Sequence, residues 1–125
     1  MPESHGTFCW NELMTTDVEK AKAFYAGVLG WTFEGMPMDQ GTYWIAKSGD
    51  EAMGGIMDMR GVMPPGVPPH WFAYIEVTNV DASVKSVKDG GGQVIRDPFD
   101  VPGVGRIAIV ADPIGAPVGL ISSVQ

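Results

Sequence analysis

The sequence contains an internal repeat, and this repeat limits the possible folds more than any other feature. The matching positions of the two copies are Trp10 and Phe72, Thr16 and Thr78, Val18 and Val80, Tyr25 and Val87, Gly30 and Gly92, Phe33 and Ile95, and Asp50 and Asp112. Self-similarity at a fixed spacing indicates a duplicated structural unit. Each copy has the pattern of a strand, a helix and three further strands. The repeat therefore predicts an α+β fold of two βαβββ modules.

The first module is expected over residues 7 to about 60. Its helix is predicted over 17–29, because Thr16-Asp17-Val18-Glu19 fits a capping box and Gly30 can end the helix in a left-handed conformation. Aromatic and apolar residues gather in four further stretches between clusters of Gly, Asp and Ser. These stretches predict strands over 8–13, 31–34, 42–46 and 52–58.

A proline-rich connector over 61–70 separates the modules, since the four prolines from Pro64 to Pro69 exclude a helix or a central strand. The second module is expected over about 71–125. Thr78-Asn79-Val80-Asp81 predicts the start of its helix, and Gly90-Gly91-Gly92 its end. Its strands are predicted over 71–77, 93–96, 105–110 and 117–122. A chain of 125 residues has the usual size of a single domain.

The charge of the chain argues against two classes of partner. Fifteen acidic and eight basic side chains give a net charge of −7, which repels both the phosphates of nucleic acid and anionic lipid headgroups. The longest apolar runs fall far below the roughly 20 residues that a membrane helix needs. The amino terminus lacks a charged and apolar leader, so a cytoplasmic location is expected.

Several motifs of this chain together resemble one known family. The motifs are Trp10-Asn11-Glu12-Leu13 leading into Thr16-Asp17, Ala23-Phe24-Tyr25, Leu29-Gly30-Trp31, Gly90-Gly91-Gly92, the run from Asp100 to Arg106, and the run from Asp112 to Ala116. They resemble the vicinal oxygen chelate superfamily of glyoxalases, bleomycin-resistance proteins and extradiol dioxygenases, above all its small glyoxalase-like branch. The resemblance covers nearly the whole chain. It implies an eight-stranded mixed sheet that curls around a cleft, and a homodimer.

The resemblance also implies four metal-ligand positions, one on the first and one on the last strand of each module. In this chain these positions fall on Trp10, Phe72, Gly55 and Gly119, and none of these side chains can donate a lone pair to a divalent cation. The sequence therefore argues against a metal-dependent glyoxalase, and no metal or other cofactor is expected. A different cation site, built from Glu76, Asp58 or His70, stays open.

Alternation along the strands predicts what lines the cleft in place of a metal. A cleft-facing Trp10 brings Glu12 to the same side, Phe72 brings Tyr74, and Gly55 brings Met53 and Met57. Such a surface suits a flat or apolar organic ligand. Trp44 and Phe99 are candidates for the rim of the opening, with plain packing as the alternative. Arg106 either pairs with an acid or holds an anionic group of the ligand.

Three functions are compatible with these residues. The first is a metal-free binding protein of the bleomycin-resistance type, for a small aromatic, apolar or cationic compound. The second is a metal-independent lyase or isomerase, with Glu12 as the general base and Tyr74 as a hydrogen-bond donor. The third is a regulatory protein whose cleft is vestigial. Since no nucleophile and base occur at a recognisable spacing, the sequence does not decide whether the chain is an enzyme.

Overall fold

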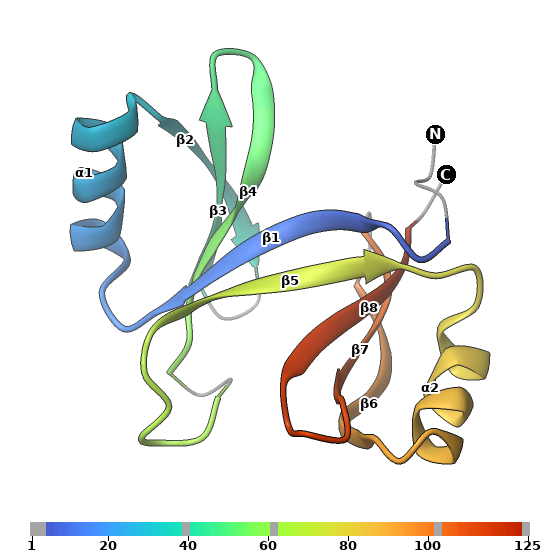
Figure 1. The fold of residues 1–125 in the computed structure, drawn as a ribbon. Coiled ribbons are helices and arrows are strands. Elements are labelled where there is room, and N and C mark those ends of the chain that lie inside the picture. Colours follow the sequence, from blue (N-terminus) through green and yellow to red (C-terminus); the bar gives the residue numbers. More distant parts are fainter. Residues whose placement is uncertain (1–4, 39–40, 61–62, 102–103, 124–125) are drawn as a thin grey trace. The chain divides into compact units, whose positions relative to one another are not determined.

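The computed structural model describes residues 5–38, 41–60, 63–101 and 104–123. It has two βαβββ modules (Figure 1). The first comprises β1 (Phe8–Thr15), α1 (Val18–Leu29), β2 (Thr32–Met38), β3 (Gly41–Ser48) and β4 (Glu51–Asp58). The second comprises β5 (His70–Glu76), α2 (Val80–Asp89), β6 (Gln93–Val101), β7 (Gly105–Ala111) and β8 (Pro117–Ser123). The expected order of elements is confirmed.

The strands form one eight-stranded mixed sheet in the order β2-β3-β4-β1-β5-β8-β7-β6. Within each module the first and last strands pair in parallel, β1 with β4 and β5 with β8, and the other pairs are antiparallel. This topology confirms the expected α+β class. By contact density the chain forms two compact units, one of Met1–Trp10 with Phe72–Gln125 and the other of Asn11–Trp71.

Both helices begin one residue later than the capping boxes predict. The cap of α1 is Asp17, whose Oδ1 accepts a hydrogen bond from the backbone N–H of Lys20 at 3.0 Å. The cap of α2 is Asn79, whose Oδ1 accepts from Ala82 N–H at 3.1 Å. A capping box would place the two threonines at the N-caps, and this is wrong: Asp17 and Asn79 are the caps, which agrees with the stronger preference for Asp and Asn over Thr at this position. The predicted end of α1 is confirmed, since Gly30 has a φ of 73°.

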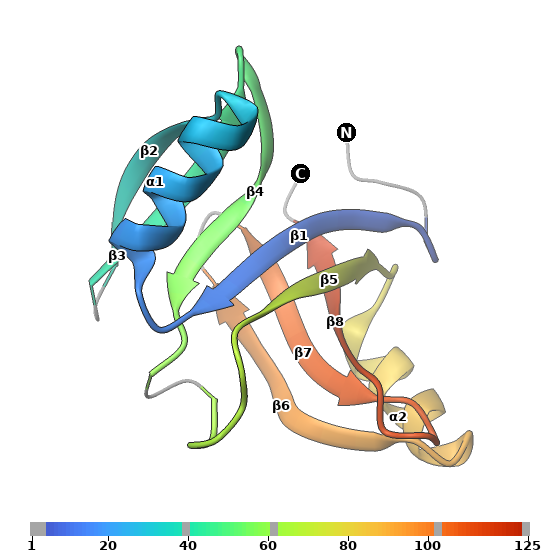
Figure 2. The same ribbon diagram turned by 60° about the vertical axis from the view of Figure 1, so that its left-hand side comes forward.

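The two helices differ in how they are held. Helix α2 packs against β6, β7 and β8, and its Val80 and Val84 are buried in a core with Val77, Ala108, Val110 and Leu120. Each buried valine contributes about 1.5 kcal/mol to the stability of this unit. Helix α1 has no buried residue, and it leaves Phe24, Val28 and Leu29 more than half exposed. In the view of Figure 2 it lies along the face of β2 and β3. Neither helix in the described part of the chain is long and apolar enough to cross a membrane.

Candidate functional site

One face of the first module's sheet carries a buried carboxylate next to a phenol. The register of β1 and β4 places Glu12 opposite Gly55, and the Glu12 side chain is only 6% exposed. The ring of Tyr43 reaches over from β3 and rests directly on Gly55, so that an added Cβ at this glycine would collide with the phenol oxygen. Glu12 and Tyr43 thus flank the same bare stretch of backbone, where a carboxylate and a phenol could exchange or share a proton with a bound molecule.

The other unit repeats this arrangement with a different residue. There Tyr74 of β5 lies opposite Gly119 of β8, and the ring of Tyr74 itself covers Gly119. The edge of Phe72 meets the Tyr74 ring, with centroids 5.3 Å apart and planes at 80°. Both aromatic side chains are buried, at 3% and 6% exposure. In each module an aromatic ring therefore takes the space of the side chain that the glycine lacks.

These contacts test the four metal-ligand positions that the family resemblance implies. Trp10 and Phe72 carry no metal donor, and tyrosine rings occupy the side-chain space at Gly55 and Gly119. The residues at these positions do not fit a divalent cation.

The alternative cation ligands have other partners. Glu76 is buried and accepts hydrogen bonds from the backbone N–H and the Oγ of Ser123, at 3.0 and 2.5 Å. The Arg60 guanidinium binds the Asp58 carboxylate at 2.6 Å and, chiefly through this hydrogen bond, lowers the pKa of that carboxyl to about 2. His70 Nδ1 lies 2.8 Å from the carbonyl oxygen of Pro68. Within the described ranges, no three His, Cys, Asp or Glu side chains gather into a metal-binding group.

Arg106 and Phe99, two further candidates from the sequence, lie in the unit that contains the second helix. Arg106 pairs with acids, the first of the two roles expected for it: its guanidinium contacts Asp81 at 2.8 Å and Asp100 at 3.2 Å. Hydrogen bonds from Arg106 lower the pKa of the Asp81 carboxyl. Phe99 is half-buried, and the guanidinium carbon of Arg96 lies 3.8 Å from the centre of its ring. Arg106 thus forms ion pairs, and the ring of Phe99 contacts the Arg96 guanidinium.

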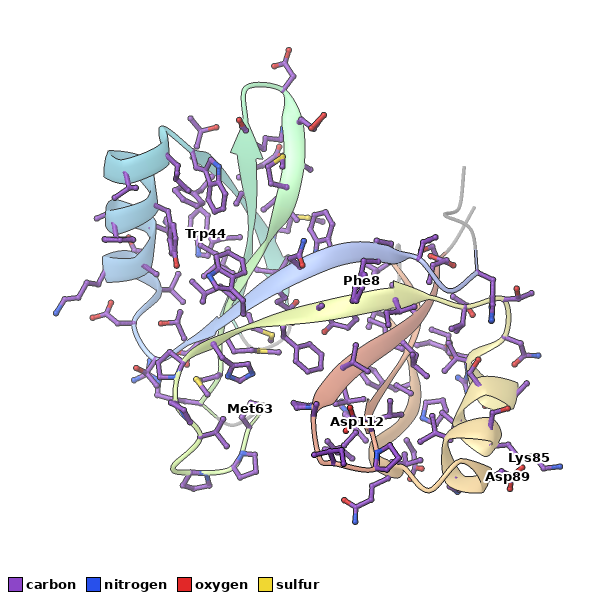
Figure 3. The ribbon with its side chains drawn as sticks, viewed as in Figure 1. Phe8, Trp44, Met63, Lys85, Asp89 and Asp112 are labelled. Atoms are coloured by element: carbon purple, nitrogen blue, oxygen red, sulfur yellow. The ribbon has the colours of Figure 1, made fainter. Side chains whose placement is uncertain are left out.

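Trp44 and Met57 lie in the first module. Trp44 faces α1, as Figure 3 shows, and the Nζ of Lys22 lies 3.2 Å from the centre of its ring. It therefore projects from the sheet face opposite to that of Tyr43, the next residue along the strand. Met57 is half-buried in β4, where it is the register partner of Met14.

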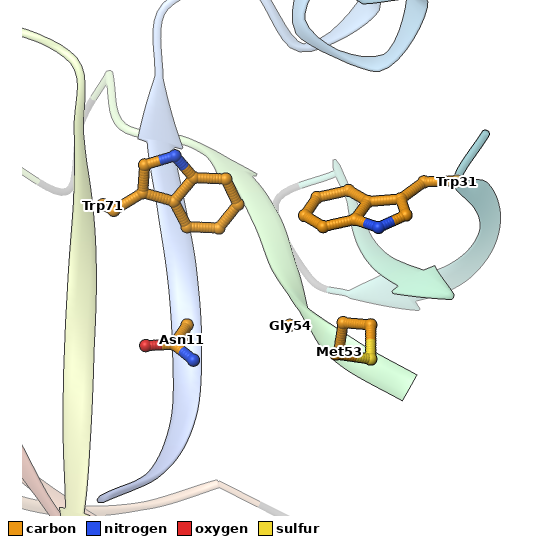
Figure 4. Close-up of a pocket in the computed structure, with 5 residues that line it drawn as sticks. All are labelled: Asn11, Trp31, Met53, Gly54 and Trp71. Carbon is orange, nitrogen blue, oxygen red and sulfur yellow. The ribbon is translucent and has the colours of Figure 1, made fainter. Parts of the chain in front are cut away.

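The face of this sheet that α1 covers holds a pocket of about 270 Å³. Its lining consists of Asn11, Trp31, Met53, Gly54 and Trp71. Figure 4 shows the two indole rings above, Asn11 and Met53 below, and the bare backbone of Gly54 between them. The two rings stand nearly perpendicular, with centroids 6.2 Å apart and planes at 87°. The accessible lining is almost entirely apolar, so the pocket suits an apolar molecule with a flat face.

Tyr25 of α1 fixes the two indole walls. Its ring stacks on Trp31, with centroids 5.4 Å apart and an interplanar angle of 23°. Its hydroxyl accepts a hydrogen bond from Nε1 of Trp71 at 3.1 Å. The edge of Phe24 adds a further contact to the Tyr25 ring, at 5.0 Å. Helix α1 has no buried residue, so aromatic contacts of its C-terminal half hold it against the sheet, and the same contacts shape the pocket.

The sequence arguments missed most of this pocket. Met53 was expected on the same face as Gly55, but the pairing of β3 with β4 shifts between Ala46 and Lys47, and Met53 lines the pocket instead. This expectation about Met53 is therefore wrong. A usable signal does exist in the repeat. Tyr25, Trp31 and Trp71 match Val87, Gln93 and Cys9 in the other copy, so none of these three aromatic residues has an aromatic counterpart in the repeat.

Comparison with known proteins identifies the family. The model of the Glyoxalase/Bleomycin resistance protein/Dioxygenase superfamily matches residues 8–120. The chain belongs to this superfamily. The resemblance inferred from the motifs is confirmed, and the paired βαβββ modules are the fold that this superfamily implies.

Two curated relatives are similar over most of this chain. A Mycobacterium tuberculosis protein named "Putative glyoxylase CFP32" is 44% identical over 112 residues, covering 89% of this chain and 42% of that protein. The anthracycline biosynthesis protein DnrV of Streptomyces peucetius is 31% identical over 123 residues, covering 89% of this chain and 45% of that protein. The chain thus spans less than half the length of these relatives.

Solved structures share the fold at low sequence identity. Methylmalonyl-CoA epimerase from Mycobacterium tuberculosis superposes with a TM-score of 0.70 at 15% identity, covering 100% of this chain and 94% of the epimerase. A hypothetical protein from Bacillus halodurans superposes with a TM-score of 0.71 at 13% identity, covering 98% of this chain and 97% of that protein.

Proposed function

We propose that this superfamily member binds a small, flat, largely apolar organic molecule in the pocket lined by Trp31, Trp71 and Gly54, and that binding requires no metal. The observation that carries the proposal is the pair of perpendicular indole rings over the bare backbone of Gly54. Indole faces and a methionine thioether bind flat aromatic ligands through stacking and adaptable van der Waals contacts.

The size of the pocket limits the ligand. Its volume of about 270 Å³ lies just below the usual range for small-molecule sites, roughly 300–1,000 Å³. It therefore accommodates two or three fused rings, or one end of a larger ring system. The relative DnrV is named for anthracycline biosynthesis, and anthracyclines are polycyclic aromatic compounds. The name of this relative supports an aromatic ligand for the present chain as well.

The absence of a metal requirement is supported by the four implied ligand positions. Two of them are glycines covered by tyrosine rings, and the other two are Trp10 and Phe72. A bound molecule would therefore be held by shape, stacking and hydrogen bonds.

The test is a binding screen with naphthalene, 1-naphthol, coumarin and acridine, followed by thermal shift and by quenching of tryptophan emission. A compound at 100 times its dissociation constant should stabilise the protein by about 2.7 kcal/mol. Trp71→Ala and Trp31→Ala should each weaken binding at least tenfold, because each removes one wall. Trp44→Ala is the matched control and should leave affinity unchanged, since Trp44 does not line the pocket. The proposal fails if none of the compounds changes the melting temperature or the emission.

A second candidate function is supported by the opposite face of the same sheet. Glu12 is buried beside Gly55, and the phenol of Tyr43 covers that glycine. A carboxylate in such surroundings suits a general base that removes a proton from carbon, as a metal-independent lyase or isomerase requires. The test is exchange of carbon-bound hydrogen for deuterium in ligands that bind. Exchange that Glu12→Gln abolishes while affinity persists would favour this candidate, and no exchange by the native protein would exclude it for those ligands.

A further inference from the structure

The pocket contains two hydrogen-bond donors that the protein itself does not use. Within the described residues, no hydrogen bond engages the amide of Asn11 or the indole N–H of Trp31. The third polar group of the lining, the indole N–H of Trp71, donates to the Tyr25 hydroxyl. Figure 4 shows the ring nitrogen of Trp31 on the edge nearer Met53, and that of Trp71 on the edge farther from Asn11. The Trp31 N–H, which can only donate, and the exposed Asn11 amide, which has both N–H donors and an acceptor oxygen, therefore remain for a ligand in an otherwise apolar pocket.

A group that can only donate selects for an acceptor when it lies in an apolar site, and the Trp31 N–H is such a group. A molecule that fills the pocket without accepting a hydrogen bond removes water from the Asn11 amide and the Trp31 N–H and gives nothing in return. A site of this kind discriminates strongly against the analogue that lacks the partner group. The lining has no charged side chain, which leaves a neutral acceptor as the best match.

From these contacts we infer the ligand class of the proposed binding function: a neutral, planar aromatic compound with a ring carbonyl. The carbonyl oxygen accepts a hydrogen bond from the Asn11 amide, the Trp31 indole N–H or both. The fused rings lie over Gly54 and against the indole walls. Asn11 and Trp31 are then the specificity-determining residues, and Tyr25 is a positioning residue that keeps the Trp71 N–H occupied.

The inference rests on the proposed function, and two bicyclic probes separate the two claims. Coumarin has a ring carbonyl, whereas naphthalene has a similar shape and no acceptor. Dissociation constants are measured by NMR titration of ¹⁵N-labelled protein, in which each tryptophan gives its own indole N–H signal. Coumarin should bind about five- to thirtyfold more tightly than naphthalene, as one or two net hydrogen bonds of about 1 kcal/mol each imply. The Trp31 N–H signal should move to higher frequency with coumarin only, and the Trp71 signal should not distinguish the probes.

Variants provide the controls. Asn11→Leu and Trp31→Phe should each reduce the preference for coumarin while naphthalene binding changes little. Gln93→Leu makes the same amide-to-leucine change at an exposed position of β6 and should change neither constant. Trp71→Phe should retain the preference, because its N–H already has a partner. Equal affinities for both probes in the native protein, or a preference that survives in both Asn11→Leu and Trp31→Phe, would overturn the inference and leave the binding function standing. Failure of both probes to bind would overturn the inference, and failure of all four compounds of the binding screen would overturn the proposed function with it.

Discussion

Substituting Gly119 by alanine tests the contact that closes one of the implied metal positions. The new Cβ would overlap the ring of Tyr74, which is 6% exposed and also makes an edge-to-face contact with Phe72, itself 3% exposed. A ring enclosed in this way can move only by displacing its neighbours, so the added methyl group overpacks the site. Overpacking of a tight core costs typically 1–3 kcal/mol. We expect Gly119→Ala to lower the free energy of unfolding by about 2 kcal/mol and the melting temperature by roughly 6–12 °C.

The assay is urea denaturation followed by circular dichroism, with two comparison variants. Gly27→Ala makes the same change in α1, where nothing lies within 4 Å of the new Cβ, and it should stabilise the protein by about 0.5–1 kcal/mol. In a Tyr74→Ala background the ring is gone, and most of the cost of Gly119→Ala should disappear. A Gly119→Ala protein as stable as the native one would refute the steric argument. The steric argument would also be refuted if Gly119→Ala lowered the free energy of unfolding by the same amount in the Tyr74→Ala background.

Three further predictions concern other parts of the chain. Asp17→Ala should destabilise the protein by about 1 kcal/mol in thermal denaturation, whereas Thr16→Ala should cost much less, because Asp17 caps α1; equal costs would contradict this assignment. The pKa of Asp58 falls from 3.8 to about 2 through the Arg60 hydrogen bonds, so this pair stabilises the folded chain above pH 3.8 and the effect is lost as the pH falls towards 2. The melting temperatures of the native protein and Asp58→Asn should accordingly differ most above pH 3.8 and converge near pH 2, and a constant gap would exclude this linkage. Neither EDTA nor added Zn²⁺, Ni²⁺ or Mn²⁺ should shift the melting temperature, and strong stabilisation by any of them would argue against metal-free binding.

The order of helices and strands could be predicted from the sequence because each element begins and ends at local motifs. Gly30 ends α1 as its permissive backbone predicts, and the repeated order of elements carries over to the two modules. The caps shifted by one residue, since a threonine and the residue after it offer competing side-chain oxygens for the same amides. These differences are small because they arise within a single turn of helix.

The candidate site could be predicted only in part, because it depends on contacts between distant residues. Strand alternation selected Glu12 as a candidate, and the structure shows that this carboxylate is buried. It could not show that Tyr43 reaches across to Gly55, since that contact depends on the register of β3 against β4. The irregular pairing at Ala46 likewise redirected Met53, and no pattern in the sequence marks such a shift. Trp71 meets Tyr25 only in the folded chain, although they lie 46 residues apart.

The division into two compact units has a consequence for how the protein could be cut. The boundaries fall inside strands, between Trp10 and Asn11 in β1 and between Trp71 and Phe72 in β5, and not in the proline-rich connector. One unit is a continuous stretch inserted into the other. Cleavage in the connector would therefore leave residues 1–10 on the first fragment, although they belong to the unit that the second fragment mainly forms. The second fragment would begin with the last residues of the other unit, which ends at Trp71. Such fragments are expected to complement each other when mixed, whereas an independently folding half would have to be excised at Asn11 and Trp71.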